Sequence, residues 1–127
     1  MTEGYLLDTS VLLRYLDDPA RLSAPVQAIL ADPNVRVAAS AASFFEIAVK
    51  KALKKAKAPD SLPDAVAAAG LEVLDLTAEH TWKTLRLPYH HTDPYDRLIL
   101  AQAAMIGLTI ITATPYFDAY KVPVIKA

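Results

Sequence analysis

Short apolar runs alternate with longer segments that carry helix signals along almost the whole chain. Runs of strand length occur at residues 5–7, 35–38, 71–76, 109–112 and 122–125. Strands that alternate with helices through short connections form a parallel sheet with helices on both faces. The sequence therefore predicts a three-layer α/β/α domain with a parallel central sheet of four to five strands. In such folds the ligand site lies beyond the carboxyl ends of the strands.

Capping residues, prolines and glycines mark where the helices are expected to begin and end. Thr9 and Ser23 are typical of helix starts, and Gly70 and Gly107 are typical of helix ends. The predicted helices cover residues 9–16, 23–31, 40–57, 62–69, 77–85 and 93–107. The chain of 127 residues has the usual length of one domain and contains no internal repeat or linker. We therefore expect residues 1–127 to form a single domain.

The composition excludes several classes of protein. The chain has no cysteine, so it forms neither disulfides nor a thiolate zinc site. The first seven residues lack the basic and apolar regions of a signal peptide. The longest apolar stretch, residues 98–113, is interrupted by polar residues and falls short of the ~20 apolar residues of a membrane span. These features predict a cytoplasmic protein with no membrane segment.

Three carboxylates occupy places where sites form in α/β domains. Asp8 follows the first predicted strand directly, and Asp93 and Asp96 share the first turn of a predicted helix. Each also has a structural explanation, because Asp8 and Asp93 can cap the helices that follow them and Asp96 suits the helix dipole. Asp93 is expected to be a cap in any case, whereas capping and a chemical role remain open alternatives for Asp8.

A fourth carboxylate, Glu46, is harder to explain by local structure. It lies in a predicted helix among Phe44, Phe45 and Ile47. Burying a carboxylate among such side chains costs free energy unless a cation or a hydrogen-bond donor compensates it. A cluster of buried carboxylates without a matching Arg or Lys implies a bound cation, and ligand sets made only of oxygen favour Mg²⁺ or Mn²⁺.

Four stretches of the chain occur in an order typical of one family. They are LLDTS at residues 6–10, SAASFFEI at 40–47, HHTDPYDRLILAQA at 90–103 and ITATPYFDAY at 111–120. In these stretches the sequence resembles PIN-domain ribonucleases, and most of all the VapC-type toxins of prokaryotic toxin–antitoxin pairs. The resemblance covers essentially the whole chain, and its most specific part is the stretch at 90–103. It implies a PIN-like fold.

The resemblance also implies a function, a cofactor and partners. It implies an endoribonuclease toxin that depends on Mg²⁺ or Mn²⁺ and hydrolyses RNA with water. Asp8, Glu46 and Asp96 fall on the three acidic positions that hold the metal in this family, and Asp93 falls on the position of an auxiliary acid. The implied partners are an RNA substrate and a small antitoxin protein, with the chain forming a homodimer or a heteromer with the antitoxin.

One position departs from the family pattern. The family usually has Thr-x-Asp after the fourth strand, whereas this chain has Thr112, Ala113 and Thr114. A hydroxyl is a weaker metal ligand than a carboxylate, so we expect one ion to bind tightly and a second weakly or only with substrate. Thr114 before Pro115 also suits a helix cap, and we favour that explanation.

Hydroxyl and basic side chains complete the predicted site. Thr9, Ser10 and Thr114 are candidates for holding the carboxylates or the water around the metal. The candidate contacts to RNA phosphates are Lys50 and Lys54, in a run of five lysines at residues 50–57, and Arg97. The alternatives are a solvated helical face for the lysines and a tether to Asp96 or another helix for Arg97.

Two adjacent histidines offer a different chemistry. His90 and His91 could serve acid–base catalysis or bind a transition metal. However, adjacent residues on an extended segment point to opposite sides, and no third histidine is near in sequence. We therefore favour a structural role for both, and a metal-independent ribonuclease is disfavoured.

Two other functions compete with the ribonuclease. The first is a catalytically weakened PIN-like module that binds RNA or protein, as the loss of the usual acid at Thr114 suggests. The second is a phosphatase of the haloacid-dehalogenase type, which would need an Asp where this chain has Ser10 and would leave Glu46 unexplained. The net charge of −1 argues weakly against RNA, but setting four acids aside in a pocket leaves ten acids against thirteen basic residues.

Overall fold

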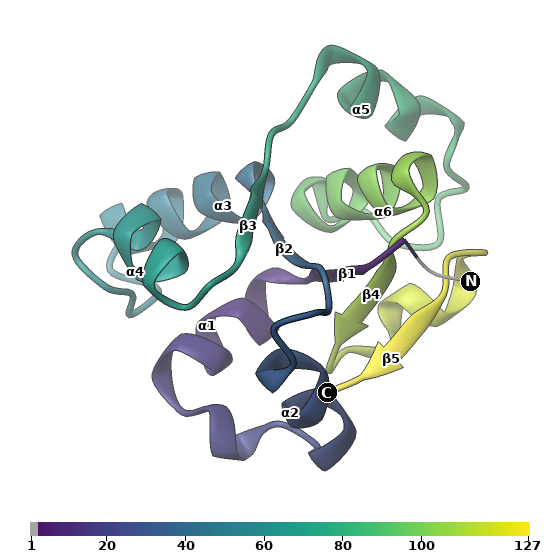
Figure 1. Cartoon of the computed structure of the whole chain (residues 1–127). Coiled ribbons are helices and arrows are strands. Elements are labelled where there is room, and N and C mark those ends of the chain that lie inside the picture. Colours follow the sequence, from purple (N-terminus) through teal and green to yellow (C-terminus); the bar gives the residue numbers. More distant parts are fainter. Residues whose placement is uncertain (1–2) are drawn as a thin grey trace.

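A parallel β-sheet forms the centre of the molecule. The computed structural model describes residues 3–127, and this part of the chain contains five strands in the order β3-β2-β1-β4-β5 (Figure 1). All neighbouring strands run parallel. The strands are β1 (Tyr5–Leu7), β2 (Val37–Ser40), β3 (Glu72–Leu74), β4 (Thr109–Thr112) and β5 (Val124–Lys126).

Helices connect the strands and cover both faces of the sheet (Figure 1). The α-helices are α1 (Thr9–Asp17), α2 (Ala24–Ala31), α3 (Ala41–Ala52), α4 (Leu62–Ala68), α5 (Ala78–Lys83) and α6 (Pro94–Ile106). Three short 3₁₀ helices are η1 (Pro19–Arg21), η2 (Thr84–Arg86) and η3 (Pro115–Ala119). In residues 3–127 no helix combines the length and the apolarity needed to cross a bilayer.

Alternation along the central strands creates a hydrophobic core on each face of the sheet. Leu6 of β1 is in register with Ala38 and Ile110, and these three residues pack with α6 and η3. Their neighbours in sequence, Leu7, Ala39 and Ile111, pack on the opposite face with α1, α2 and α4. This arrangement confirms the predicted three-layer α/β/α fold with a parallel sheet.

The strand order fixes the place of the ligand site. From the central strand β1 the chain proceeds to β2 and β3 on one side, and later to β4 and β5 on the other. In open α/β sheets, ligands bind at such a switch point, beyond the carboxyl ends of the two strands that flank it. Here the two strands are β1 and β4. Asp8 directly follows the end of β1, and Thr112 is the last residue of β4.

Several predicted boundaries are wrong, and the helix predicted at residues 40–57 differs most. It ends at Ala52, because Lys54 adopts a left-handed conformation with φ of 57°. The amides of Lys54 and Lys55 then donate to the carbonyls of Lys51 and Lys50. This is a Schellman ending, which normally uses glycine, so no stop signal is visible at this position in the sequence. Lys54 and Lys57 therefore lie beyond the helix that carries Glu46.

The other differences are smaller. The strand predicted at 35–38 is Val37–Ser40, and the strands predicted at 71–76 and 122–125 are Glu72–Leu74 and Val124–Lys126. The helix predicted at 77–85 divides into α5 and η2. The strand β2 extends two residues beyond its predicted end, as far as Ser40. The hydroxyl of Ser40 accepts from Ala42 N and so caps α3 directly after the strand.

Candidate active site

An acidic pocket lies at the switch point of the sheet. It has a volume of about 220 Å³ and contains all four acids singled out from the sequence. The lining residues are Asp8, Thr9, Ser10, Leu13, Glu46, Ile47, Lys50, Ala56, Asp93 and Asp96. Segments from α1, α3 and α6 therefore bring together carboxylates that are up to 88 residues apart in sequence.

Asp8 is almost completely buried at the start of α1. Its Oδ1 accepts from Val11 N at 2.8 Å and from Ser10 Oγ at 3.2 Å, and its Oδ2 accepts from Thr112 Oγ1. Asp8 is therefore the N-cap of α1, as one of the two alternatives predicted. Burial raises the pKa of the Asp8 carboxyl, although the bonds from Thr112, Val11 and Ser10 oppose this rise. The Asp8 carboxylate therefore caps α1 and lines the pocket at the same time.

The hydroxyl groups that hold the acids agree only in part with those predicted. Thr112, which the sequence analysis did not select, holds Asp8, whereas Thr114 accepts from Tyr116 N and caps η3, as the favoured explanation stated. Thr9 hydrogen-bonds Ser43 at 2.9 Å and joins α1 to α3. Of the three predicted hydroxyls, only that of Ser10 has a carboxylate among its described hydrogen-bond partners.

Glu46 is buried and only partly compensated. Its Oε2 accepts from Lys50 Nζ at 2.5 Å, a contact between residues one turn apart on α3. Its Oε1 has no hydrogen-bond partner within residues 3–127. The bond to Glu46 raises the pKa of the Lys50 ammonium. A basic side chain therefore matches one oxygen of Glu46, whereas the other oxygen has no partner among the described residues.

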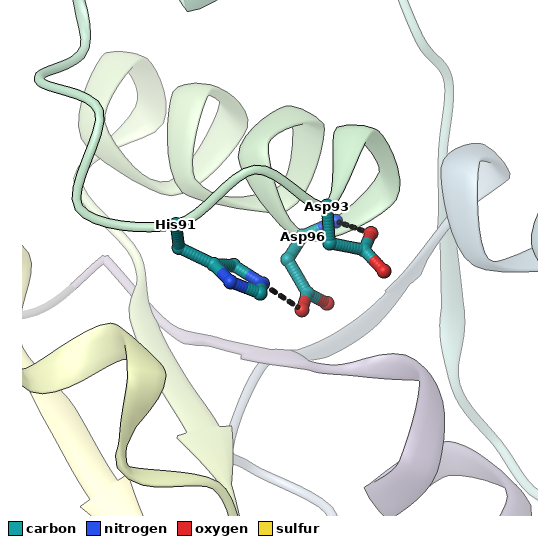
Figure 2. Close-up of side chains that lie close together, drawn as sticks. All are labelled: His91, Asp93 and Asp96. Carbon is teal, nitrogen blue, oxygen red and sulfur yellow. Dashed lines mark hydrogen bonds and ion pairs between the residues drawn. The ribbon is translucent and has the colours of Figure 1, made fainter.

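The first turn of α6 supplies two further acids. Asp93 Oδ1 accepts from Tyr95 N and Asp96 N, which confirms Asp93 as the N-cap. Asp96 Oδ2 accepts from His91 Nε2 at 2.8 Å (Figure 2). Burial raises the pKa of Asp96 to about 6, and the charges of Asp93 and Glu46 add to this rise while the bond from His91 opposes it.

His91, for which a structural role is predicted from the sequence, lies beside the acids of the pocket. Its ring stacks on that of Tyr116, with 4.6 Å between the ring centroids. Its Nε2 is directed at Asp96 (Figure 2). One ligand atom each from His91, Asp93 and Asp96 lie within 4.8 Å of one another. His90 packs against Tyr120 instead, in agreement with a structural role. The two histidines do diverge, but one of them faces the acids.

Arg97 is buried, and its guanidinium hydrogen-bonds backbone carbonyls. Its guanidinium donates to the carbonyls of Thr84 at 2.8 Å, Pro88 at 2.9 Å and Leu87 at 3.2 Å, and lies over the ring of Tyr89. Arg97 therefore tethers α6 to η2 and to the loop after it, which agrees with the alternative of a tether to another helix better than with a contact to RNA. Lys50 pairs with Glu46, and Lys54 is exposed beyond α3, so their contacts with RNA remain predictions.

We expect Arg97→Lys to lower the free energy of unfolding by about 2–4 kcal/mol, because an ammonium cannot reproduce the planar set of bonds that the guanidinium makes to four carbonyls, including that of His91. Urea unfolding measures this change, and Arg86→Lys, which alters an exposed arginine of η2, is the matched control. If Arg97 served RNA rather than the fold, its replacement would leave the unfolding midpoint unchanged and weaken RNA binding.

Comparison with solved structures supports the fold. A chain in the crystal structure of VapBC2 from Rickettsia felis bound to a promoter DNA fragment is 18% identical, with a TM-score of 0.72 over 96% of this chain and 97% of that one. VapBC-5 from Mycobacterium tuberculosis, a member of the VapBC family of toxin–antitoxin systems, gives 24% identity and a TM-score of 0.63 over 98% of both chains. A toxin–antitoxin complex from Klebsiella pneumoniae gives 20% and 0.65 over 96% of both.

Comparison of the sequence with known families gives a specific result. Among curated proteins, none matches this sequence significantly. The profile of the PIN domain matches residues 5–122, which include strands β1 to β4 and every acid of the pocket. The chain belongs to the PIN domain family.

Proposed function

We propose that this protein is a metal-dependent endoribonuclease, and specifically the toxin of a toxin–antitoxin pair. The observation that carries the proposal is the buried Glu46 Oε1, which has no hydrogen-bond partner within residues 3–127 and belongs to a pocket shared with Asp8, Asp93 and Asp96. A buried carboxylate oxygen without a partner is costly. A cation in the pocket would remove this cost.

The residues of the pocket fit a hard divalent ion. Asp8, Glu46 and Asp96 would hold it through oxygen, a donor set that suits Mg²⁺ or Mn²⁺. A bound divalent ion makes water more acidic and offsets the negative charge of a phosphodiester. Because Thr114 supplies no carboxylate, we expect one ion to bind tightly and a second weakly or only with substrate.

The surrounding residues fix the orientation of the acids. Thr112, Ser10 and the amide of Val11 hold Asp8, and His91 holds Asp96. Carboxylates that are already oriented need little reorganisation when charge develops during the reaction. In this proposal Glu46 would hold the metal or orient the attacking water. Hydrolysis by water would leave a 5′-phosphate and a 3′-hydroxyl and would not require the 2′-hydroxyl of RNA.

The proposed partners follow from the similar structures. VapBC-5 from Mycobacterium tuberculosis belongs to the VapBC family of toxin–antitoxin systems, and the similar structure from Klebsiella pneumoniae is a toxin–antitoxin complex. We propose that this chain likewise binds a small antitoxin and forms a homodimer or a heteromer with it. A second candidate function is an RNA- or protein-binding module with weakened catalysis, which the absence of an acid at Thr114 favours.

The decisive experiment is cleavage of an end-labelled single-stranded RNA. We expect cleavage with Mn²⁺ or Mg²⁺, its loss in EDTA and its return when metal is added in excess. Glu46→Gln should lower the rate by about 10²-fold, the usual effect of removing one group that stabilises developing charge. Glu79→Gln, a change of an exposed glutamate on α5, should leave the rate unchanged.

A single 2′-deoxynucleotide at the cleavage position separates the mechanisms. Water attack tolerates this substitution, so cleavage should persist. Cleavage that needs the 2′-hydroxyl and continues in EDTA would contradict the proposal and indicate a histidine-based ribonuclease. Binding of RNA without cleavage under any metal condition would instead support the binding module.

A further inference from the structure

The acidic pocket contains a positive charge of its own. Lys50 is the only residue with a positive charge among the described residues that line the pocket. Its Nζ lies 2.5 Å from Glu46 Oε2. The pocket otherwise presents the carboxylates of Asp8, Glu46, Asp93 and Asp96. Lys50 therefore offsets part of the negative charge that these four acids concentrate in one place.

The two partners of this ion pair differ strongly in exposure. The side chain of Glu46 is 6% exposed and that of Lys50 is 47% exposed. A buried carboxylate cannot regain its hydration without unfolding the helix, whereas a lysine on the surface can turn its ammonium into water at little cost. If a second cation approaches Glu46, Lys50 is the partner that is free to leave.

A divalent ion held by Glu46 would lie close to the ammonium of Lys50. Like charges a few ångströms apart in a partly buried pocket repel strongly, and Oε2 is already covered by Lys50. We propose that Lys50 is a built-in counter-cation, which stabilises the metal-free pocket and is displaced from Glu46 when a divalent ion binds. This inference rests on the proposed metal-dependent function.

The exchange has a consequence for metal affinity. In this proposal, repulsion between the bound ion and the ammonium breaks the bond between Lys50 and Glu46, so the affinity of the intact protein is lower than its four carboxylates alone would give. Removing the ammonium while keeping the length and packing of the side chain should therefore tighten metal binding. An orienting role for Lys50 would have the opposite result, because losing it would weaken binding.

Calorimetric titration of Mn²⁺ into the purified full-length protein tests the proposal. We expect Lys50→Met to bind Mn²⁺ about tenfold more tightly than the unmodified protein, in keeping with removal of a nearby like charge. Lys50→Arg should bind as the unmodified protein does. The matched control is Lys55→Met, which removes an exposed charge just beyond α3 that makes no ion pair within residues 3–127, and its affinity should stay within twofold.

Two further readouts do not depend on activity. The metal-free Lys50→Met protein should melt at a lower temperature than the unmodified protein, and saturating Mn²⁺ should raise its melting temperature by more. In the unmodified protein, the NMR signal of the Lys50 ammonium should lose its hydrogen-bonded character when Mg²⁺ is added. Unchanged or weaker Mn²⁺ binding by Lys50→Met, or a Lys50 signal unaffected by Mg²⁺, would overturn the proposal.

The titration also separates the two proposals from each other. If the unmodified protein binds no divalent ion, the proposed function and the counter-cation role both fail. If it binds Mn²⁺ and cleaves RNA but Lys50→Met binds with the same affinity, only the role of Lys50 fails.

Discussion

Replacing Asp96 with asparagine is expected to make the metal-free protein more stable and to abolish metal-dependent RNA cleavage. The charge of Asp96 is costly in the folded state, because burial and the neighbouring charges of Asp93 and Glu46 raise its pKa from 3.8 to about 6. A rise of this size corresponds to a penalty of at most about 3 kcal/mol at neutral pH. The variant loses a favourable charge in the first turn of α6, so we expect a net gain of about 1–2 kcal/mol.

The stability gained by Asp96→Asn should increase with pH. The folded protein binds a proton at Asp96 more tightly than the unfolded chain does, so protonation favours the fold. This contribution is fully present below pH 3.8 and is lost as the pH rises through about 6. Asparagine carries no charge at any pH. The stability of the variant should therefore exceed that of the unmodified protein most above pH 6, and the difference should shrink as the pH falls toward 4.

Urea unfolding at several pH values in EDTA measures this difference. Asp118→Asn is the control, because Asp118 is an exposed acid paired with Lys126, and its replacement should change stability little at any pH. In the presence of Mn²⁺, Asp96→Asn should cleave RNA at least about 10²-fold more slowly. A variant that is less stable than the unmodified protein at pH 7.5, or one that keeps its activity, would contradict this account.

The fold was predictable because its elements carry local signals. Proline in the first turn and glycine at the end define α6, and the alternation of Leu6 and Leu7 between two cores follows from strand geometry. The end of α3 was not predictable, since a lysine at position 54 takes the left-handed conformation that usually requires glycine. The backbone bonds from Lys54 and Lys55 to the carbonyls of Lys51 and Lys50 stabilise this ending, although lysine itself disfavours the left-handed conformation.

The acids of the site were also predictable, whereas their partners were not. Asp8, Glu46, Asp93 and Asp96 stand out by their positions at element ends or among apolar neighbours, and the fold brings all four to one pocket. Thr112 reaches Asp8 only because β4 lies beside β1, which depends on the strand order. No local pattern in the sequence encodes that order.

The role of His91 depends on the loop before α6, whose conformation is also set by contacts between residues distant in sequence. Arg97 binds the carbonyls of Thr84, Leu87 and Pro88 and so fixes the backbone that leads to His91. With this backbone in place, His91 stacks on Tyr116 and bonds Asp96. The sequence shows both the histidine and the arginine, but only the folded loop shows that one positions the other.

Replacing Asp8 separates its two roles, capping α1 and serving the acidic pocket. Asparagine caps helices about as well as aspartate, so in Asp8→Asn the side-chain oxygen should still accept from Val11 N. Alanine removes the cap, and we expect Asp8→Ala to be less stable than Asp8→Asn by about 1–2 kcal/mol. Burial already raises the pKa of Asp8, so loss of its charge should not destabilise the metal-free protein.

The rate of RNA cleavage should depend on the negative charge of residue 8 and not on its ability to cap α1. Both Asp8→Asn and Asp8→Ala should lower Mn²⁺-dependent cleavage of labelled RNA by at least about 10²-fold, because neither can provide the anionic oxygen that the pocket presents next to Glu46. Thermal melting in EDTA and the cleavage assay, performed on the same preparations, measure the two effects independently. Cleavage by Asp8→Asn at the rate of the unmodified protein would show that Asp8 only caps α1, and equal loss of stability in both variants would show that the cap is not what Asp8 contributes to the fold.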